Sequence, residues 1–236
     1  MGHTFCFSRA STTVLALVGL SASTWAAQYS WNFGSGLLPN EVDPTMAPMF
    51  QPGVLNPDGL HISTSPHLFM SYYEQSGANI VRPENFVLSF RLRVPYDYSG
   101  YPEIRSGTMF NANLGDNVGI TFGIANDEIY FLNTENTMRG GTAFVDTGRA
   151  FHDYLLVIHT PTRQFTFHQD GIQVLSGITP GYGNSPPSIW WGDGTQYAGG
   201  LGIWQTFEHN AAAVPEPASL AALVIGALIL ARKRAN

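Results

Sequence analysis

The feature that most constrains the fold is an alternation of apolar and polar residues between Phe86 and Val94. Apolar side chains occupy every second position, at Phe86, Leu88, Phe90, Leu92 and Val94, and Ser89, Arg91 and Arg93 lie between them. Because successive side chains of a β-strand point to opposite faces, this spacing predicts a half-buried antiparallel strand.

A second alternating stretch predicts a β-hairpin. Val118, Ile120, Phe122 and Ile124 alternate and are followed by Asn126-Asp127, two residues that tolerate positive φ and can form a two-residue turn. Counting outward from that turn places Ile124 opposite Ile129 and Phe122 opposite Phe131. One face of the hairpin is then apolar in both strands, as a packed hairpin requires.

Asp170-Gly171 marks another hairpin, since this dipeptide favours a type I′ turn. It separates Gln164–Gln169 from Ile172–Val174. The register that follows from a two-residue turn sets Phe167 opposite Val174.

Several shorter stretches also have strand character. The continuously apolar residues 154–158 predict a central strand covered on both faces, and the remaining strands are expected at residues 60–64, 67–73, 108–112, 189–191 and 201–207. Five prolines make residues 39–57 a loop or a set of edge pieces. No amphipathic helix of useful length lies between residues 27 and 213, so the pattern predicts an all-β sandwich.

The first 26 residues have the features of a secretory signal. Arg9 is the one basic residue of the first part, Val14 to Leu20 is apolar, and Thr24-Trp25-Ala26 ends on a small residue. We expect an N-terminal signal helix and cleavage by signal peptidase after Ala26. The domain that follows would span residues 27–213 and be exported.

The end of the chain carries a different signal. Val214, Pro215, Glu216 and Pro217 precede an uncharged apolar run at 218–231, and Arg232, Lys233 and Arg234 follow it. The run predicts a C-terminal transmembrane helix, although its length of about 21 Å is short for a hydrocarbon layer of about 30 Å. The basic residues would act as stop-transfer charges and keep the C-terminus in the cytoplasm.

This order of motifs at 214–236 resembles the PEP-CTERM sorting signal of exopolysaccharide-producing Gram-negative bacteria. The resemblance implies an exosortase as partner, which would recognise Pro215, Glu216 and Pro217 and release or re-attach the exported domain. The protein would reside transiently in the inner membrane as a precursor and then reach the cell surface or be secreted.

A second resemblance covers roughly residues 86–210. It rests on the strand at 152–158, the Asp170-Gly171 hairpin, and the segments Ile189-Trp-Trp-Gly-Asp-Gly194 and Gly199-Gly-Leu-Gly-Ile-Trp204. Together they are similar to the C-terminal half of concanavalin A-like, laminin-G-like jelly rolls. That family binds carbohydrates, glycosaminoglycans or proteins, and some members hydrolyse glycans.

Composition limits the partners and the chemistry. Residues 27–213 contain seven arginines and sixteen acidic residues, and this negative net charge disfavours nucleic acid as a partner. The single cysteine, Cys6, lies in the signal segment. The exported domain therefore has no disulfide, no catalytic thiol and no cysteine-ligated metal.

The sequence contains no motif for retaining glycoside hydrolysis. A sandwich glycosidase carries paired carboxylates on one strand, about 5–5.5 Å apart, and Asp127-Glu128 would point to opposite faces. The spacing does not exclude a polysaccharide lyase, whose catalytic residues come from distant strands. No cofactor is predicted. Calcium could bind Asp193 between its two glycines, and the competing interpretation is a turn carboxylate that accepts hydrogen bonds from its own backbone.

Two tyrosine-containing loops are the candidate glycan sites. Aromatic side chains beside a carboxylate or amide could stack on a sugar and bind its hydroxyl groups, and the candidates are Tyr96, Asp97, Tyr98 and Tyr101 in one loop and Tyr182 and Asn184 in the other. The competing interpretation is packing of these rings against the rim of the sheet. Of Trp190, Trp191 and Trp204, at least two are expected in the core.

Three functional hypotheses follow. The first is a non-enzymatic exported protein that binds glycan, exopolysaccharide or matrix through loops at one end of the sandwich. The second is a polysaccharide-degrading lyase or hydrolase, which would release oligosaccharides. The third is a structural matrix protein without a ligand.

Overall fold

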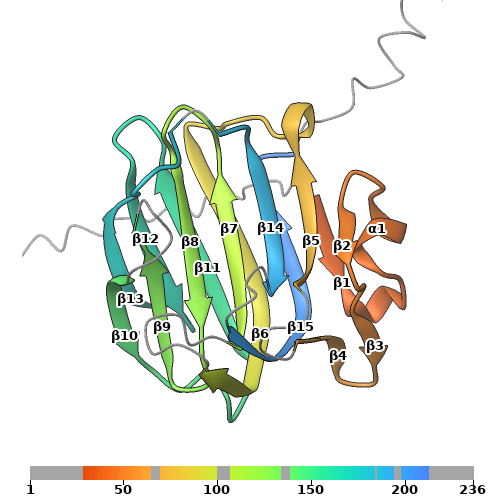
Figure 1. Ribbon diagram of the computed structural model, residues 1–236. Coiled ribbons are helices and arrows are strands. Elements are labelled where there is room, and N and C mark those ends of the chain that lie inside the picture. Colours follow the sequence, from red (N-terminus) through yellow and green to blue (C-terminus); the bar gives the residue numbers. More distant parts are fainter. Residues whose placement is uncertain are drawn as a thin grey trace, which may run out of the picture.

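The computed structural model describes residues 29–64, 70–99, 107–133, 139–183, 185–193 and 198–212. Within these ranges the chain forms two antiparallel sheets that pack face to face (Figure 1). The predicted signal segment (1–26) and the predicted sorting and membrane segment (214–236) lie outside the described residues. No helix in the described part of the chain is long and apolar enough to cross a membrane.

Sheet A contains eight strands among the described residues. In spatial order these are β13 (Ile172–Ile178), β12 (Gln164–Gln169), β11 (His152–His159), β6 (Asn85–Ser99), β15 (Ala198–His209), β4 (Gly59–Thr64) and β3 (Val54–Asn56), and β1 (Tyr29–Asn32) also pairs with β15.

Sheet B contains seven strands in the same described ranges. Their order is β10 (Arg139–Phe144), β9 (Glu128–Leu132), β8 (Gly119–Ile124), β7 (Thr108–Asn113), β14 (Ser188–Asp193), β5 (Ser71–Ser76) and β2 (Ala47–Phe50). The described helices are single turns: η1 (Phe33–Ser35), α1 (Pro39–Val42) and η2 (Gly77–Asn79). Figure 1 shows α1 beside β2 at one edge of the sandwich.

An aromatic core fills the space between the sheets. Phe90 of sheet A has its ring centroid 4.9 Å from that of Tyr154, on the neighbouring strand, and 4.9 Å from that of Phe110, in sheet B. Trp191 and Trp204, from opposite sheets, are fully buried with centroids 4.8 Å apart. Two of the three tryptophans in question are therefore in the core, as predicted.

The strand predictions are largely confirmed. The five alternating residues from Phe86 to Val94 are all at most 2 % exposed and face the core. In the first hairpin Ile124 is opposite Ile129 and Phe122 is opposite Phe131, as the two-residue turn requires. The proline-rich residues 39–57 form the short helix α1 and the strands β2 and β3, which lie at the edges of the two sheets.

Two local predictions were wrong, and the turn at Asn126-Asp127, which is present as predicted, has an unexpected backbone conformation. A β-bulge in β13 places Phe167 opposite Leu175 instead of Val174, because Val174 is an extra residue in that strand. Neither Asn126 nor Asp127 has a positive φ, whereas Asp170 and Gly171 both do, at 51° and 78°. Residues 154–158 lie in the interior strand β11, but Leu155 and Val157 are only half-buried, so its second face is not fully covered.

Two other differences concern where strands begin and end. Of the strand expected at residues 67–73, residues 67–69 lie outside the described ranges; β5 begins at Ser71 and extends to Ser76, three residues beyond the predicted end. Strand β10 was not predicted, since its two glycines are unusual in a strand. Both glycines lie against the ring of Phe131, where an added Cβ would come within 2.2 Å and 2.8 Å of ring atoms.

The two ends of the described chain lie at the same end of the sandwich. Tyr29 pairs with His209, and Ala212 forms a bridge with Ile80. The side chain of Asn210 accepts a hydrogen bond from the Val87 N–H at 2.9 Å and donates to the Asn85 carbonyl at 2.9 Å. The opposite end of the sandwich therefore carries neither end of the described chain.

Candidate functional site

The outer face of sheet B carries a lateral row of polar and aromatic side chains. Glu74 pairs with Trp190, Trp190 with Asn111, and Asn111 with Thr121, so the row crosses β5, β14, β7 and β8. Their chain neighbours Tyr73, Trp191, Phe110 and Phe122 are buried in the core. Because side chains alternate along a strand, the row itself points away from the core. We call Glu74, Trp190, Asn111 and Thr121 the sheet B row.

Aromatic rings extend this row along the sheet. The Tyr72 and Trp190 rings are half-buried, with centroids 5.5 Å apart, and the ring of Phe50 lies 6.3 Å from that of Tyr72. Trp190 also packs on a small apolar cluster of Met109, Tyr130 and Leu132. This support holds the indole in place while leaving part of it open to solvent.

The polar part of the row is pre-ordered by hydrogen bonds. Asn111 Nδ2 donates to Thr121 Oγ1 at 2.9 Å, and the Thr121 hydroxyl is hydrogen-bonded to that of Tyr182. The Asn111 Oδ1 atom is buried without a hydrogen-bond partner among the described residues. Asn111 and Thr121 are only 5 % and 2 % exposed, so this hydrogen-bonded pair supports the surface beside Trp190 from below.

Tyr182 lies on the same outer face and covers Gly119, where an added Cβ would come within 2.5 Å of its ring. Burial raises the pKa of the Tyr182 hydroxyl above its ordinary value. The hydroxyl is therefore neutral at physiological pH and can both donate and accept a hydrogen bond.

Glu74 is a half-buried carboxylate at one end of the sheet B row. Burial raises its pKa above the ordinary value. The Glu74 side chain forms no hydrogen bond or ion pair with any other described residue. By contrast, the Glu128 carboxylate binds Arg139 through two hydrogen bonds of 2.7 and 2.8 Å. The Arg139 guanidinium also lies 4.3 Å from the centre of the Tyr130 ring, so this second carboxylate belongs to a structural contact.

The carboxylates on the described strands of sheet B lack the arrangement that glycoside hydrolysis needs. On the described strands of sheet B no two carboxylates share a face of one strand. Glu74 and Glu128 are four strands apart, or about 19 Å at about 4.8 Å per strand. Both known arrangements of catalytic carboxylates need separations of about 5–9.5 Å.

The predicted tyrosine-rich loop is in part a strand. Tyr96, Asp97 and Tyr98 lie in β6 and pair with β15. The register places Val94 and Pro95 opposite the single residue Gly202, a β-bulge that reverses the alternation. Tyr96 and Tyr98 consequently point to solvent, 39 % and 49 % exposed, with ring centroids 5.5 Å apart.

The same bulge turns Asp97 away from the two tyrosines. One of its carboxylate oxygens accepts a hydrogen bond from the Asn126 N–H at 2.8 Å, just beyond the end of β8 at Ile124. Tyr182 lies at the other end of β8, over Gly119. The two groups of candidate glycan residues are thus about 17 Å or more apart and do not form one site. Tyr101 and Asn184 lie outside the described residues.

Asp193, the candidate calcium ligand, is fully buried between the sheets and accepts a hydrogen bond from the Thr64 hydroxyl. Among the described residues there is no group of three or more histidine or acidic side chains that could hold a metal ion. Asp193 is the last residue of strand β14.

Sequence alone did not identify the sheet B row. Its four members come from positions 74, 111, 121 and 190, and no local motif connects them. The one available signal was the alternation in each strand, which places Asn111 and Thr121 between apolar residues that face the core.

Comparison with known proteins identifies the fold. No protein-family model matches the chain, and no curated protein matches its sequence. Among solved structures, it is similar to the carbohydrate esterase vb_24B_21 from the Shiga toxin-encoding bacteriophage phi24B, with a TM-score of 0.55 and 10 % identity over 80 % of this chain and 99 % of that one.

Two further solved structures show the same similarity. The apo Crh5 transglycosylase has a TM-score of 0.53 and 10 % identity over 81 % of this chain and 87 % of that one. The metal-free Emp46p carbohydrate recognition domain has a TM-score of 0.51 and 9 % identity over 80 % of this chain and 99 % of that one. The fold is therefore a two-sheet sandwich of the concanavalin A-like type.

Proposed function

We propose that this protein is an exported, non-enzymatic β-sandwich that binds a polysaccharide through the outer face of sheet B. The observation that carries the proposal is the sheet B row, in which a half-buried indole and a half-buried carboxylate lie beside a buried, hydrogen-bonded amide and hydroxyl. Sites for organic ligands combine aromatic surface with a few well-placed polar groups, and this row has both.

The similarity to carbohydrate-active proteins supports the ligand class. The solved structures of similar fold are an esterase and a transglycosylase that act on carbohydrate or glycan, by their names, and a carbohydrate recognition domain. The separation of Glu74 from Glu128 supports binding over glycoside hydrolysis. The binding surface proposed here differs from the loops at one end of the sandwich that were expected from the sequence.

The test is binding of exopolysaccharide and of a glycan array by the purified protein and by single variants. Trp190→Ala should weaken binding at least about tenfold, since removing a central aromatic anchor costs about 1.4 kcal/mol or more. Ile172→Ala, a truncation of a side chain that is 71 % exposed on sheet A, is the matched control and should bind normally.

Three results would contradict the proposal. If Tyr98→Ala abolishes binding and Trp190→Ala does not, the ligand site is at the end of β6, as the sequence predicted. If the protein releases oligosaccharides from the polysaccharide, it is an enzyme. A protein that leaves the polymer unbound and uncut would support the ligand-free matrix role.

We further propose that the C-terminal segment is a PEP-CTERM sorting signal and that the protein passes through the inner membrane to the cell surface or medium. The support is the order of Pro215-Glu216-Pro217, the apolar run and the basic triplet. Replacing these three residues with alanine should retain the protein in the inner membrane of a host that has an exosortase. Cell fractionation and immunoblotting would measure release, and normal release of that variant would refute the assignment.

A further inference from the structure

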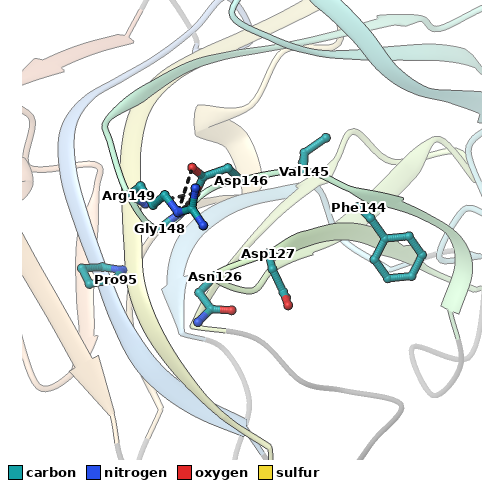
Figure 2. A pocket seen from close by; sticks show the side chains of 8 residues that line it. All are labelled: Pro95, Asn126, Asp127, Phe144, Val145, Asp146, Gly148 and Arg149. Atoms are coloured by element: carbon teal, nitrogen blue, oxygen red, sulfur yellow. Dashed lines mark hydrogen bonds and ion pairs between the residues drawn. The ribbon is translucent and has the colours of Figure 1, made fainter.

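Figure 2 shows a solvent-open cleft lined by Pro95. It lies at the end of the sandwich opposite Tyr29 and Ala212, because β15 pairs His209 with Leu88 at one end of β6 and Leu201 with Tyr96 toward the other. The cleft has a volume of about 560 Å³ and is formed by three segments: Pro95 after the bulge of β6, the turn Asn126–Asp127, and the connection from Phe144 to Arg149. A chain tethered by either terminus would keep this end free.

Buried hydrogen bonds join the three segments and hold the cleft open. Thr147 is fully buried, and its N–H donates to the Asn126 carbonyl at 3.3 Å while its carbonyl accepts from the Val94 N–H at 2.8 Å. The Thr147 hydroxyl donates to the Ala125 carbonyl. Next to it, Gly148 leaves no room for a side chain, because an added Cβ would lie 2.9 Å from the Val94 carbonyl oxygen. The walls are therefore preformed.

The exposed side chains of the cleft combine a ring with charged groups. Phe144 is 81 % exposed, so its ring is open to a ligand. Asp146 accepts backbone hydrogen bonds from Arg149 and Gly148, at 3.1 Å each, which lower the pKa of this carboxyl and keep it ionised. The Arg149 side chain is 92 % exposed, and its Nε lies 3.8 Å from Asp146, so the guanidinium is only loosely held.

In the view of Figure 2, Phe144 lies at one side of the cleft and Arg149 at the other, with Asn126 and Asp127 between them. We propose that this cleft is a second saccharide site, for a neutral sugar unit, separate from the sheet B row. The ring offers a flat apolar surface for one face of a pyranose, and the carboxylate and guanidinium groups can pair with adjacent hydroxyls. Two carboxylates beside one guanidinium disfavour an anionic sugar.

This inference rests on the proposed function, because the ligand class is the same. Phe144 is on β10 and Trp190 on β14, four strands away, so the two sites are about 19 Å or more apart. Two short oligosaccharides could bind at once, and a polymer could be held at two points. The protein would then cross-link polysaccharide chains or bind one chain with higher avidity.

The test is isothermal titration calorimetry of the purified full chain with neutral tetrasaccharides of glucose, mannose, galactose and N-acetylglucosamine. The expected result is two sites per chain for at least one probe. Phe144→Ala and Arg149→Ala should each weaken binding at the cleft at least about tenfold and leave binding at the sheet B row unchanged. Trp190→Ala should weaken binding at the sheet B row and leave binding at the cleft unchanged. Ile172→Ala is the control with unchanged stoichiometry, and thermal unfolding would confirm that all variants fold.

The outcomes separate this inference from the proposed function. A single site that Trp190→Ala abolishes and Phe144→Ala leaves intact overturns the second site and keeps the sheet B row. A single site that Phe144→Ala abolishes and Trp190→Ala leaves intact overturns the sheet B row as the ligand surface. A chain that binds none of the probes and no exopolysaccharide overturns both.

Discussion

At the scale of single residues, His209 is a titratable group enclosed by the core. It is 1 % exposed, its ring stacks on that of Tyr29 at 5.2 Å, and its Nδ1 accepts the Ala211 N–H at 3.3 Å. Burial lowers the pKa of His209 from 6.5 to about 3. The folded protein therefore holds a neutral imidazole where the unfolded chain would bind a proton.

This difference predicts acid sensitivity. Because the pKa is lowered on folding, the contribution of His209 to stability is complete above pH 6.5 and is lost as the pH falls toward 3, at about 1.4 kcal/mol per pH unit. His209→Gln, which keeps an acceptor for Ala211, should flatten the free energy of unfolding between pH 6.5 and 4. Urea denaturation at several pH values would measure it, and an unchanged slope would show that other groups control the acid response.

Glu74 should show the opposite pH dependence. Its folded pKa is raised by burial, so the ionised carboxylate destabilises the fold above that pKa and the penalty disappears on acidification. Glu74→Gln should therefore raise the melting temperature at pH 7 and change it little at pH 4.

Glu128→Gln is the matched comparison. This side chain is 3 % exposed and forms a two-point pair with Arg139, so the variant leaves a guanidinium without its counter-charge. We expect a loss of roughly 3 kcal/mol at pH 7. Equal changes in stability for Glu74→Gln and Glu128→Gln at pH 7 would contradict the difference between an unpaired and a paired carboxylate.

At the scale of elements, the β8–β9 hairpin depends on a glycine beneath a tyrosine. A Cβ at Gly123 would lie 2.3 Å from the Tyr130 ring, and Tyr130 is fully buried. Gly123→Ala should cost about 1–3 kcal/mol through overpacking. Gly177→Ala, in the edge strand β13 with a nearest contact of 3.1 Å, should cost less. Chemical denaturation of both variants measures the difference, and equal losses would contradict the packing argument.

The two hairpins also show how far local sequence determines pairing. The β8–β9 register could be predicted because a two-residue turn and one apolar face give the same answer. In the β12–β13 hairpin, Val174 and Leu175 are both apolar, so either can oppose Phe167 without exposing a polar group to the core. The choice between them was made by the bulge, which depends on packing across the sheet.

At the scale of the whole molecule, Phe90 connects the two sheets. It is 2 % exposed, and its ring contacts rings in sheet A and Phe110 in sheet B. Phe90→Ala should destabilise the protein by about 3–5 kcal/mol, because it leaves a cavity in the centre of the core. Phe144→Ala, the same change at an 81 % exposed position, should alter stability by less than about 0.5 kcal/mol. Comparable losses would show that Phe144 is packed.

The arrangement of the candidate surfaces is also a property of the whole molecule. Both ends of the described chain meet at one end of the sandwich, the cleft lies at the other, and the sheet B row covers an outer face. If the C-terminal segment anchors the precursor as proposed, both surfaces are accessible while the chain is still tethered.

The sequence by itself predicted most of the strands, their inward faces and two hairpin turns, because these follow from alternation and turn chemistry between residues a few positions apart. It also located the one cysteine outside residues 27–213 and predicted, from charge, that nucleic acid is not a partner. Only the tertiary structure decided which distant strands became neighbours, and so brought Glu74, Asn111, Thr121 and Trp190 into one row. It also decided, through the bulge at Val94 and Pro95, that Tyr96 and Tyr98 face solvent. Strand pairing depends on packing over the whole core, and no local pattern encodes it.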